Sequence, residues 1–98
     1  MHILTVAYGH PSVPTEFDLH YETVHKPLAL QLPEIRQLQV SRCSGIEGSQ
    51  PPFYVIAELS FDSVEALQKA LASPEGQAAA EDVETFADGG VTLFLQHR

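Results

Sequence analysis

The sequence predicts a single α+β domain whose elements follow the order β-α-β-β-α-β around one four-stranded antiparallel sheet. Four segments show the short apolar or alternating patterns typical of strands, and two longer segments between them show helical spacing. With 98 residues, 44% of them hydrophobic, the chain can bury one core but has no room for a second. We therefore expect residues 1–98 to form one domain.

The first half of the chain predicts a strand, a helix and a second strand. Residues 1–8 are an apolar run of β-formers, and residues 15–18 resemble a helix-capping arrangement. A helix of about sixteen residues should follow, because apolar side chains recur at helical spacing in Phe17, Tyr21, Val24 and Leu28. Pro27 should kink this helix next to His25. The alternation over residues 35–43 predicts a half-buried strand, followed by a loop.

The second half predicts a central strand, a divided helix and a final strand. Residues 53–61 alternate most regularly, which places one set on a common face: Phe53, Val55, Ala57, Leu59 and Phe61. Ser63 and Ser73 can each cap a helix, so the second helix should be broken in two. Gly89 should help to end it, and residues 91–96 return as the last strand.

One face of the predicted sheet lacks a cover within the chain. The element order is that of the ferredoxin-like motif, in which both helical segments lie on the same face. The other face should carry Ala7, Tyr54, Ile56 and Phe94 among Thr5, Glu58, Thr92 and Gln96. Such a face is too apolar to leave in water, so we expect a second copy to cover it, forming a homodimer and a dimeric α/β barrel with a lumen. A monomer that tolerates some exposed apolar surface is the alternative.

Composition narrows the choice of partners. The formal charge is -8 with five Lys and Arg, which argues against nucleic acid and against an anionic membrane. A small apolar organic compound fits better. The single cysteine, Cys43, cannot form an intramolecular disulfide, and the sequence shows no targeting or membrane-spanning pattern. The cytoplasm is therefore the expected location.

Part of the predicted first helix resembles the Y-x-x-x-H-x-P-L signature of the EthD family of dimeric α/β-barrel proteins, with Tyr21, His25, Pro27 and Leu28 at the matching positions. The likeness covers essentially the whole chain. It continues at Pro52-Phe53-Tyr54, at residues 58–63, at Ser73-Pro74-Glu75, and at Asp82 and Phe86. The family is named for a protein encoded with a cytochrome P450 system that degrades ethyl tert-butyl ether, and its biochemical role is mostly undefined. The resemblance therefore implies a dimeric barrel, and it suggests that an oxygenase could be a partner protein.

Three residues are candidates for chemistry. His25 can take or return a proton near neutral pH, and it matches the family histidine. Tyr21, one turn earlier, could orient the imidazole or share a ligand oxygen. Glu58 could act as an acid or base if it faces the lumen. Each of the three also has a structural alternative. His25 could bond to a backbone carbonyl at the Pro27 kink, and Tyr21 could pack in the core. Glu58 could be solvated or form a salt bridge with Arg42.

The remaining candidates are weaker. Asp82 matches the family pattern, but we expect it on the helix surface or in a cap. Cys43 has no activating neighbour in the sequence. His20 and His25 should point about 140° apart on an α-helix, so they should not chelate one metal ion. The sequence has no phosphate loop or dinucleotide fingerprint, and we expect no cofactor.

Two functions of different class follow. The first is a cofactor-independent isomerase, cyclase or monooxygenase in which His25 is the general base on an apolar carbonyl or phenolic compound in the lumen of the dimeric barrel. The second is a non-catalytic binding or accessory protein for a partner oxygenase. An imidazole that faces a cavity would favour the enzyme, and a buried ring bonded to backbone would favour the binding protein.

Overall fold

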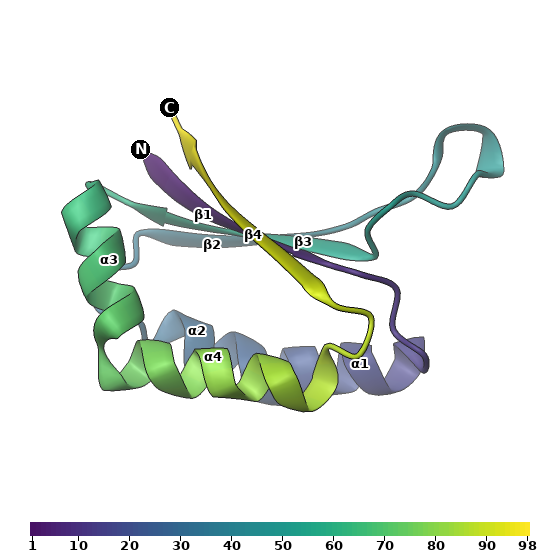
Figure 1. Cartoon of the computed structure of the whole chain (residues 1–98), viewed down its shortest axis with the longest axis horizontal. Coiled ribbons are helices and arrows are strands. Elements are labelled where there is room, and N and C mark those ends of the chain that lie inside the picture. The colour runs from purple at the N-terminus through teal and green to yellow at the C-terminus, as the bar shows by residue number, and fades with distance from the viewer.

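Four antiparallel strands form one sheet, and helices α1 to α4 lie on a single side of it (Figure 1). The computed structural model describes all residues from 1 to 98. The strands lie in the order β2-β3-β1-β4, with bounds β1 His2–Tyr8, β2 Gln37–Arg42, β3 Val55–Phe61 and β4 Val91–His97. The helical elements are α1 Pro14–His20, η1 Tyr21–His25, α2 Lys26–Leu30, α3 Val64–Ala72 and α4 Pro74–Phe86, with a short 3-10 turn, η2 Ile46–Gly48, between β2 and β3. The predicted ferredoxin-like fold is confirmed.

The first helical run, from α1 through η1 to α2, contains a wide π turn where a kink was predicted. Pro27 has no backbone N–H, and its ring would clash with the carbonyl one α-helical turn earlier. The backbone N–H of Lys26 bonds to the carbonyl of Tyr21, five residues back, as a π turn requires. The predicted irregularity next to His25 is therefore present, in the form of a widened turn.

Some element boundaries differ from the prediction. Helix α1 begins at Pro14, whose fixed φ suits the first helical position, and no side chain caps it. The capping arrangement predicted over residues 15–18 is therefore wrong, because those residues already lie inside the helix. Strands β2 and β3 each begin two residues later than predicted.

The second helix is divided at Ser73, as predicted. The Ser63 hydroxyl accepts a hydrogen bond from the N–H of Ala66 at the start of α3, and the Ser73 hydroxyl accepts one from Gly76 at the start of α4. Gly76 also allows a close approach, since a Cβ there would collide with the carbonyl oxygens at the end of α3. The two helices therefore meet at a sharp corner (Figure 1).

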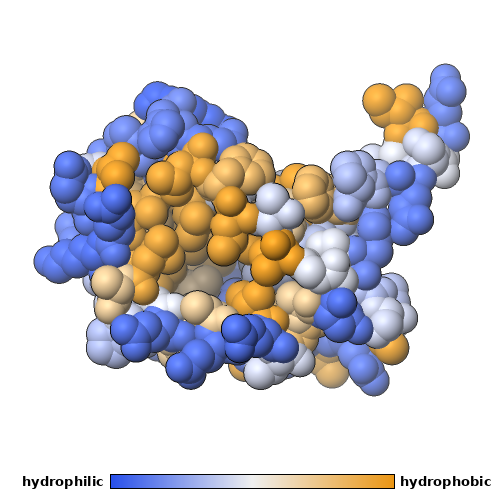
Figure 2. Space-filling model, viewed as in Figure 1, coloured by the Kyte–Doolittle hydropathy of each residue, from blue (hydrophilic) through white to orange (hydrophobic).

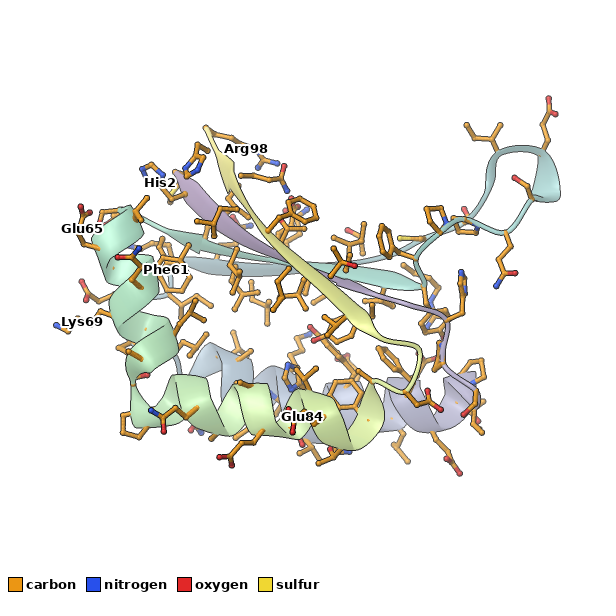
Figure 3. All side chains as sticks on the ribbon, in the orientation of Figure 1. His2, Phe61, Glu65, Lys69, Glu84 and Arg98 are labelled. Carbon is orange, nitrogen blue, oxygen red and sulfur yellow. The ribbon has the colours of Figure 1, made fainter.

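The core lies between the sheet and the helices and draws on alternate residues of the central strands. The helix side of β3 supplies Val55, Ala57, Leu59 and Phe61, as predicted, and Phe61 points towards α3 (Figure 3). Thr5, Glu58 and Phe94 are cross-strand neighbours on the opposite side, which no helix of the chain covers. The two faces of the sheet thus have separate environments.

Strand β4 is an edge strand with exposed apolar side chains on both faces. Leu93, on the helix side, is 61% exposed, and Phe94, on the opposite side, is 46% exposed. The loop between β2 and β3 projects away from the rest of the chain (Figure 1). No helix is long and apolar enough to cross a membrane.

Replacing Ser73 should test the corner between α3 and α4. Ser73→Ala removes the hydroxyl that caps α4 and should lower the free energy of unfolding by about 1 kcal/mol. Chemical denaturation measures this change. Ser44→Ala, at an exposed position outside any helix or strand, is the matched control and should leave stability unchanged. Equal effects of the two substitutions would contradict the capping role.

Candidate functional site

A cavity of about 340 Å³ lies between the sheet and the helices within one chain. Figure 2 shows a hollow lined with apolar atoms on the face where β4 crosses in front of the sheet. Most of its lining is apolar, from the inner faces of the strands and from α4; its polar groups include Tyr8, Tyr21, His25 and Glu84. A cavity of this size can hold a small organic molecule.

The position of the cavity corrects one expectation. We expected His25 to face a lumen formed between two sheets. The structure places His25 on the helix side, in the cavity of its own chain, while the uncovered face of the sheet lies on the other side of the strands. The prediction failed because the sequence showed a histidine on an apolar helix face but not the space beneath it.

The His25 imidazole is held by two side chains from other elements. Its Nδ1 lies 2.9 Å from Oδ2 of Asp82 on α4, and its Nε2 lies 3.3 Å from the hydroxyl of Tyr8 on β1. Neither partner is a backbone carbonyl, so the predicted alternative of a backbone bond at the Pro27 kink is wrong. The His25 side chain is 7% exposed and borders the cavity.

Asp82 connects His25 to a second histidine. Nε2 of His20 lies 2.9 and 3.0 Å from the two carboxylate oxygens of Asp82. Asp82 is only 12% exposed, and it joins α4 to both α1 and η1. The surface or capping role predicted for Asp82 is therefore wrong. The family pattern was the signal that could have identified it, because it included Asp82 together with His25.

The π turn explains why two histidines reach one carboxylate. On an α-helix, residues five apart diverge, which is why His20 and His25 were expected to point about 140° apart. A π turn bonds residue i to residue i+5 and so brings such residues to the same side. We did not predict this convergence, because we expected regular α-helical geometry up to Pro27.

The electrostatics of the site define its hydrogen bonds. Burial lowers the pKa of His25 and outweighs the opposite effect of Asp82, so the imidazole is neutral near pH 7. Burial tends to raise the pKa of the Asp82 carboxyl, but hydrogen bonds from His20 and His25 hold it below its usual value. An ionised Asp82 accepts a proton donor, so Nδ1 of His25 carries the hydrogen and Nε2 keeps its lone pair.

Tyr8 and Tyr21 both line the cavity beside His25. Burial raises the pKa of Tyr8, so its phenol stays protonated and donates to Nε2 of His25. Burial also raises the pKa of Tyr21, to about 12. Every fully shielded side-chain oxygen or nitrogen has a hydrogen-bond partner, whereas the Tyr21 hydroxyl has none within the chain. It therefore reaches accessible space in one of the hollows that the ring borders.

Glu58 does not belong to this site. It lies on the opposite face of the sheet, where Oε2 accepts a hydrogen bond from Gln96 at 2.9 Å and lies 3.5 Å from the Arg98 guanidinium. The structure thus supports the salt-bridge alternative, although the predicted partner Arg42 is wrong. Arg42 pairs with Asp18 of α1.

Tyr54 was also assigned to the wrong face of the sheet. It precedes β3, outside the strand alternation, and its hydroxyl donates to Asp18 at 2.8 Å while accepting from Arg42 at 3.0 Å. Its ring packs edge-on against Phe17 on the helix side. Tyr54 therefore ties the start of β3 to α1.

The structure contains no group of three or more His, Cys, Asp or Glu side chains arranged to hold a metal ion. The imidazole nitrogens that face Asp82 are engaged by its carboxylate. The cavity residues supply groups for acid–base and hydrogen-bonding chemistry, with a neutral imidazole beside a phenol.

The fold places the chain among the ferredoxin-like α+β proteins, and a cavity lies between its helices and its sheet. Within this class, the sequence model of the EthD domain matches residues 10–90. The chain belongs to the EthD family. It is 43% identical over 95 residues to an uncharacterised 11.0 kDa protein from the thcB-thcC intergenic region of Rhodococcus erythropolis, covering 97% of this chain and 92% of that protein.

Solved structures share the whole fold. An EthD-family protein from Bacillus halodurans C-125 superposes with a TM-score of 0.94 at 33% identity, covering 100% of this chain and 98% of that one. A dimeric ferredoxin-like protein of unknown function from Thermobifida fusca gives 0.72 at 12% identity, with coverage of 100% and 92%. SnoaB, a cofactor-independent oxygenase from Streptomyces nogalater, gives 0.69 at 14% identity, with coverage of 99% and 90%. The last two likenesses show the fold alone.

The neutral state of buried His25 should make stability depend on pH. Because its folded pKa lies below its unfolded pKa, the unfolded chain takes up a proton first as pH falls from 7 to 5. Stability should then fall by about 1.4 kcal/mol for every pH unit over which only the unfolded chain holds that proton. Denaturation at a series of pH values should show a smaller fall for His25→Gln. Identical pH dependence in both proteins would contradict the buried, neutral assignment.

Proposed function

We propose that this protein is a cofactor-independent enzyme that moves a proton on a small, largely apolar compound with a carbonyl or phenolic oxygen. The compound binds in the cavity between the helices and the sheet, and His25 is the general base. The observation that carries the proposal is a neutral imidazole, fixed by Asp82 through Nδ1, whose Nε2 lies beside the Tyr8 hydroxyl at the cavity. The reaction is of the isomerase, cyclase or monooxygenase type.

The geometry supports a specific division of roles. Nε2 of His25 takes a proton from a phenol or from a carbon next to a carbonyl, and the resulting imidazolium is paired with the Asp82 carboxylate. Once Nε2 is protonated, it no longer accepts a hydrogen bond from the Tyr8 hydroxyl. This hydroxyl then donates to the substrate oxygen on which negative charge develops. Return of the proton from His25 to a different atom completes an isomerisation or cyclisation. Oxygenation would need dioxygen as a second reactant.

The cavity lining favours a compound with one polar end. His25, Tyr8 and Tyr21 supply polar groups at the sheet and η1, whereas α4 contributes small residues and the exposed Glu84. Gly76 and Ala79 leave space beside the helix that a larger side chain would fill. An aromatic ring or a short alkyl body would lie there, with its oxygen directed to His25.

A non-catalytic role is the second candidate. The same cavity could hold a compound for a partner oxygenase, which the name of the family suggests through its link to ethyl tert-butyl ether degradation. The contacts of His25 favour the enzyme, because a residue that only filled space would not need a buried carboxylate to fix its Nδ1 proton. The two candidates differ in whether the bound compound is converted.

Substitution of His25 separates the two candidates. A panel of small phenols, aromatic ketones and lactones is first screened for binding by NMR, and bound compounds are then assayed for conversion. His25→Gln should retain binding and lower kcat by about 10²–10⁴-fold. Glu58→Gln, on the other face of the sheet, is the matched control and should keep full activity. Compounds that bind but are never converted by the unmodified protein would favour the binding protein.

We also propose that a second copy covers the open face of the sheet and forms the dimeric barrel. Several fold relatives are described as dimeric. The face carries exposed Phe94 and half-buried Ile56, and no helix of the chain lies over it. Burial of these side chains by a second sheet would remove apolar area from water.

The assembly can be tested on one strand. Phe94→Glu places a charge on the uncovered face and should convert a dimer into a monomer in sedimentation measurements. Leu93→Glu adds the same charge at the adjacent position on the helix side, and it should leave the dimer intact. A monomeric unmodified protein at every concentration, or dissociation by Leu93→Glu alone, would contradict this interface.

A further inference from the structure

His20 and His25 lie on two sides of the same carboxylate but border different spaces. His25 borders the apolar cavity, and its side chain is 7% exposed. The His20 side chain is 29% exposed and borders a separate hollow of about 250 Å³ with mostly polar walls. Asp82 thus bridges a buried imidazole to one that reaches solvent.

One carboxylate can compensate only one positive charge. If both imidazoles were protonated, two cations would share the single negative charge of Asp82, and the second would be uncompensated. The His25 ring is the more buried of the two, with 7% of its side chain exposed against 29% for His20. A positive charge on buried His25 would lack hydration. Burial accordingly lowers the pKa of His25, and the charge of His20 lowers it further.

The two rings face different titratable groups. The hollow beside His20 is also lined by the carboxylates of Glu16 and Asp88. His25 faces the phenols of Tyr8 and Tyr21, both kept neutral by burial. Glu84 on α4 also lines the cavity and lies at its outer side (Figure 3).

His20 also has a fixed orientation. Its ring stacks on Phe86 with 4.7 Å between the ring centroids, and its Nε2 contacts both oxygens of Asp82. This bond restrains the carboxylate so that Oδ2 stays against Nδ1 of His25. The arrangement resembles the support that outer hydrogen bonds give to catalytic groups.

We propose that His20 is a positioning residue for His25 that acts through Asp82. It holds the Asp82 carboxylate against Nδ1 of His25, so that Nε2 of His25 keeps its lone pair for the cavity. The catalytic consequence rests on the proposed function of His25, but the coupling between the two rings does not.

The coupling can be measured without a substrate. Long-range ¹H–¹⁵N NMR spectra of the full chain, recorded between pH 8 and pH 4.5, follow protonation of His25 directly. His20→Gln keeps an N–H donor for Asp82 but cannot be charged, and it should raise the His25 midpoint by about one pH unit. His20→Phe removes the donor as well, and it should raise the midpoint and weaken the preference for the Nδ1–H tautomer. His97→Gln, at the far end of β4, is the control for loss of a histidine and should change neither.

Each outcome bears on a separate claim. A His25 midpoint in His20→Gln that stays within about 0.2 pH units of the unmodified protein would overturn the coupling. If the His25 midpoint rises, the acidic limb of the pH–rate profile should shift to higher pH by the same number of pH units. A shifted midpoint in a protein that converts no compound of the panel would support the coupling and overturn the proposed reaction.

Discussion

The carboxylate of Asp82 accepts hydrogen bonds from two imidazoles, and the organisation of the site depends on that contact. It joins α4 to the first helical run through His20 and His25. It also fixes which nitrogen of His25 carries the proton, because an ionised carboxylate accepts only a donor. Without it, His25 would be a buried histidine with no preferred tautomer, and Nε2 would have no defined role towards Tyr8.

A backbone constraint places the two histidines. Pro27 cannot donate the hydrogen bond that a regular α-helix needs, and the chain widens into the π turn of η1. Residues five apart then lie on one side, so His20 and His25 both meet Asp82. The Y-x-x-x-H-x-P sequence therefore encodes a backbone geometry as well as a set of side chains. π turns are frequent at functional sites, where they redirect a side chain.

Most of the fold could be predicted from local signals. Strict alternation identified β3, and the serines at positions 63 and 73 identified the starts of α3 and α4, because hydroxyl capping is a short-range interaction. The site was harder to predict. His25 and Tyr21 were identified by type and by family pattern, but the contact with Asp82 joins residues 57 positions apart and depends on how α4 crosses the first helical run.

The incorrect assignments have related physical causes. Tyr54 was assigned to a face by the alternation of side chains along β3. That alternation does not apply to it, because β3 begins one residue later, at Val55. Glu58 pairs with Arg98 because β1 pairs with both β3 and β4, so that Glu58 reaches the end of the chain across β1. The sequence does not specify this register. His25 was expected to face a lumen between two sheets, whereas it borders a cavity on the helix side, where α4 contributes small side chains.

The protonation state of His25 is the central claim, and its tautomer can be observed directly. Long-range ¹H–¹⁵N NMR at pH 7 distinguishes a nitrogen that carries hydrogen from one that does not. We expect a neutral ring with hydrogen on Nδ1 and none on Nε2, and we expect Asp82→Asn to lose that preference. A ring protonated on both nitrogens, or a neutral ring with hydrogen on Nε2, would contradict a general base held by Asp82 and aimed at the cavity.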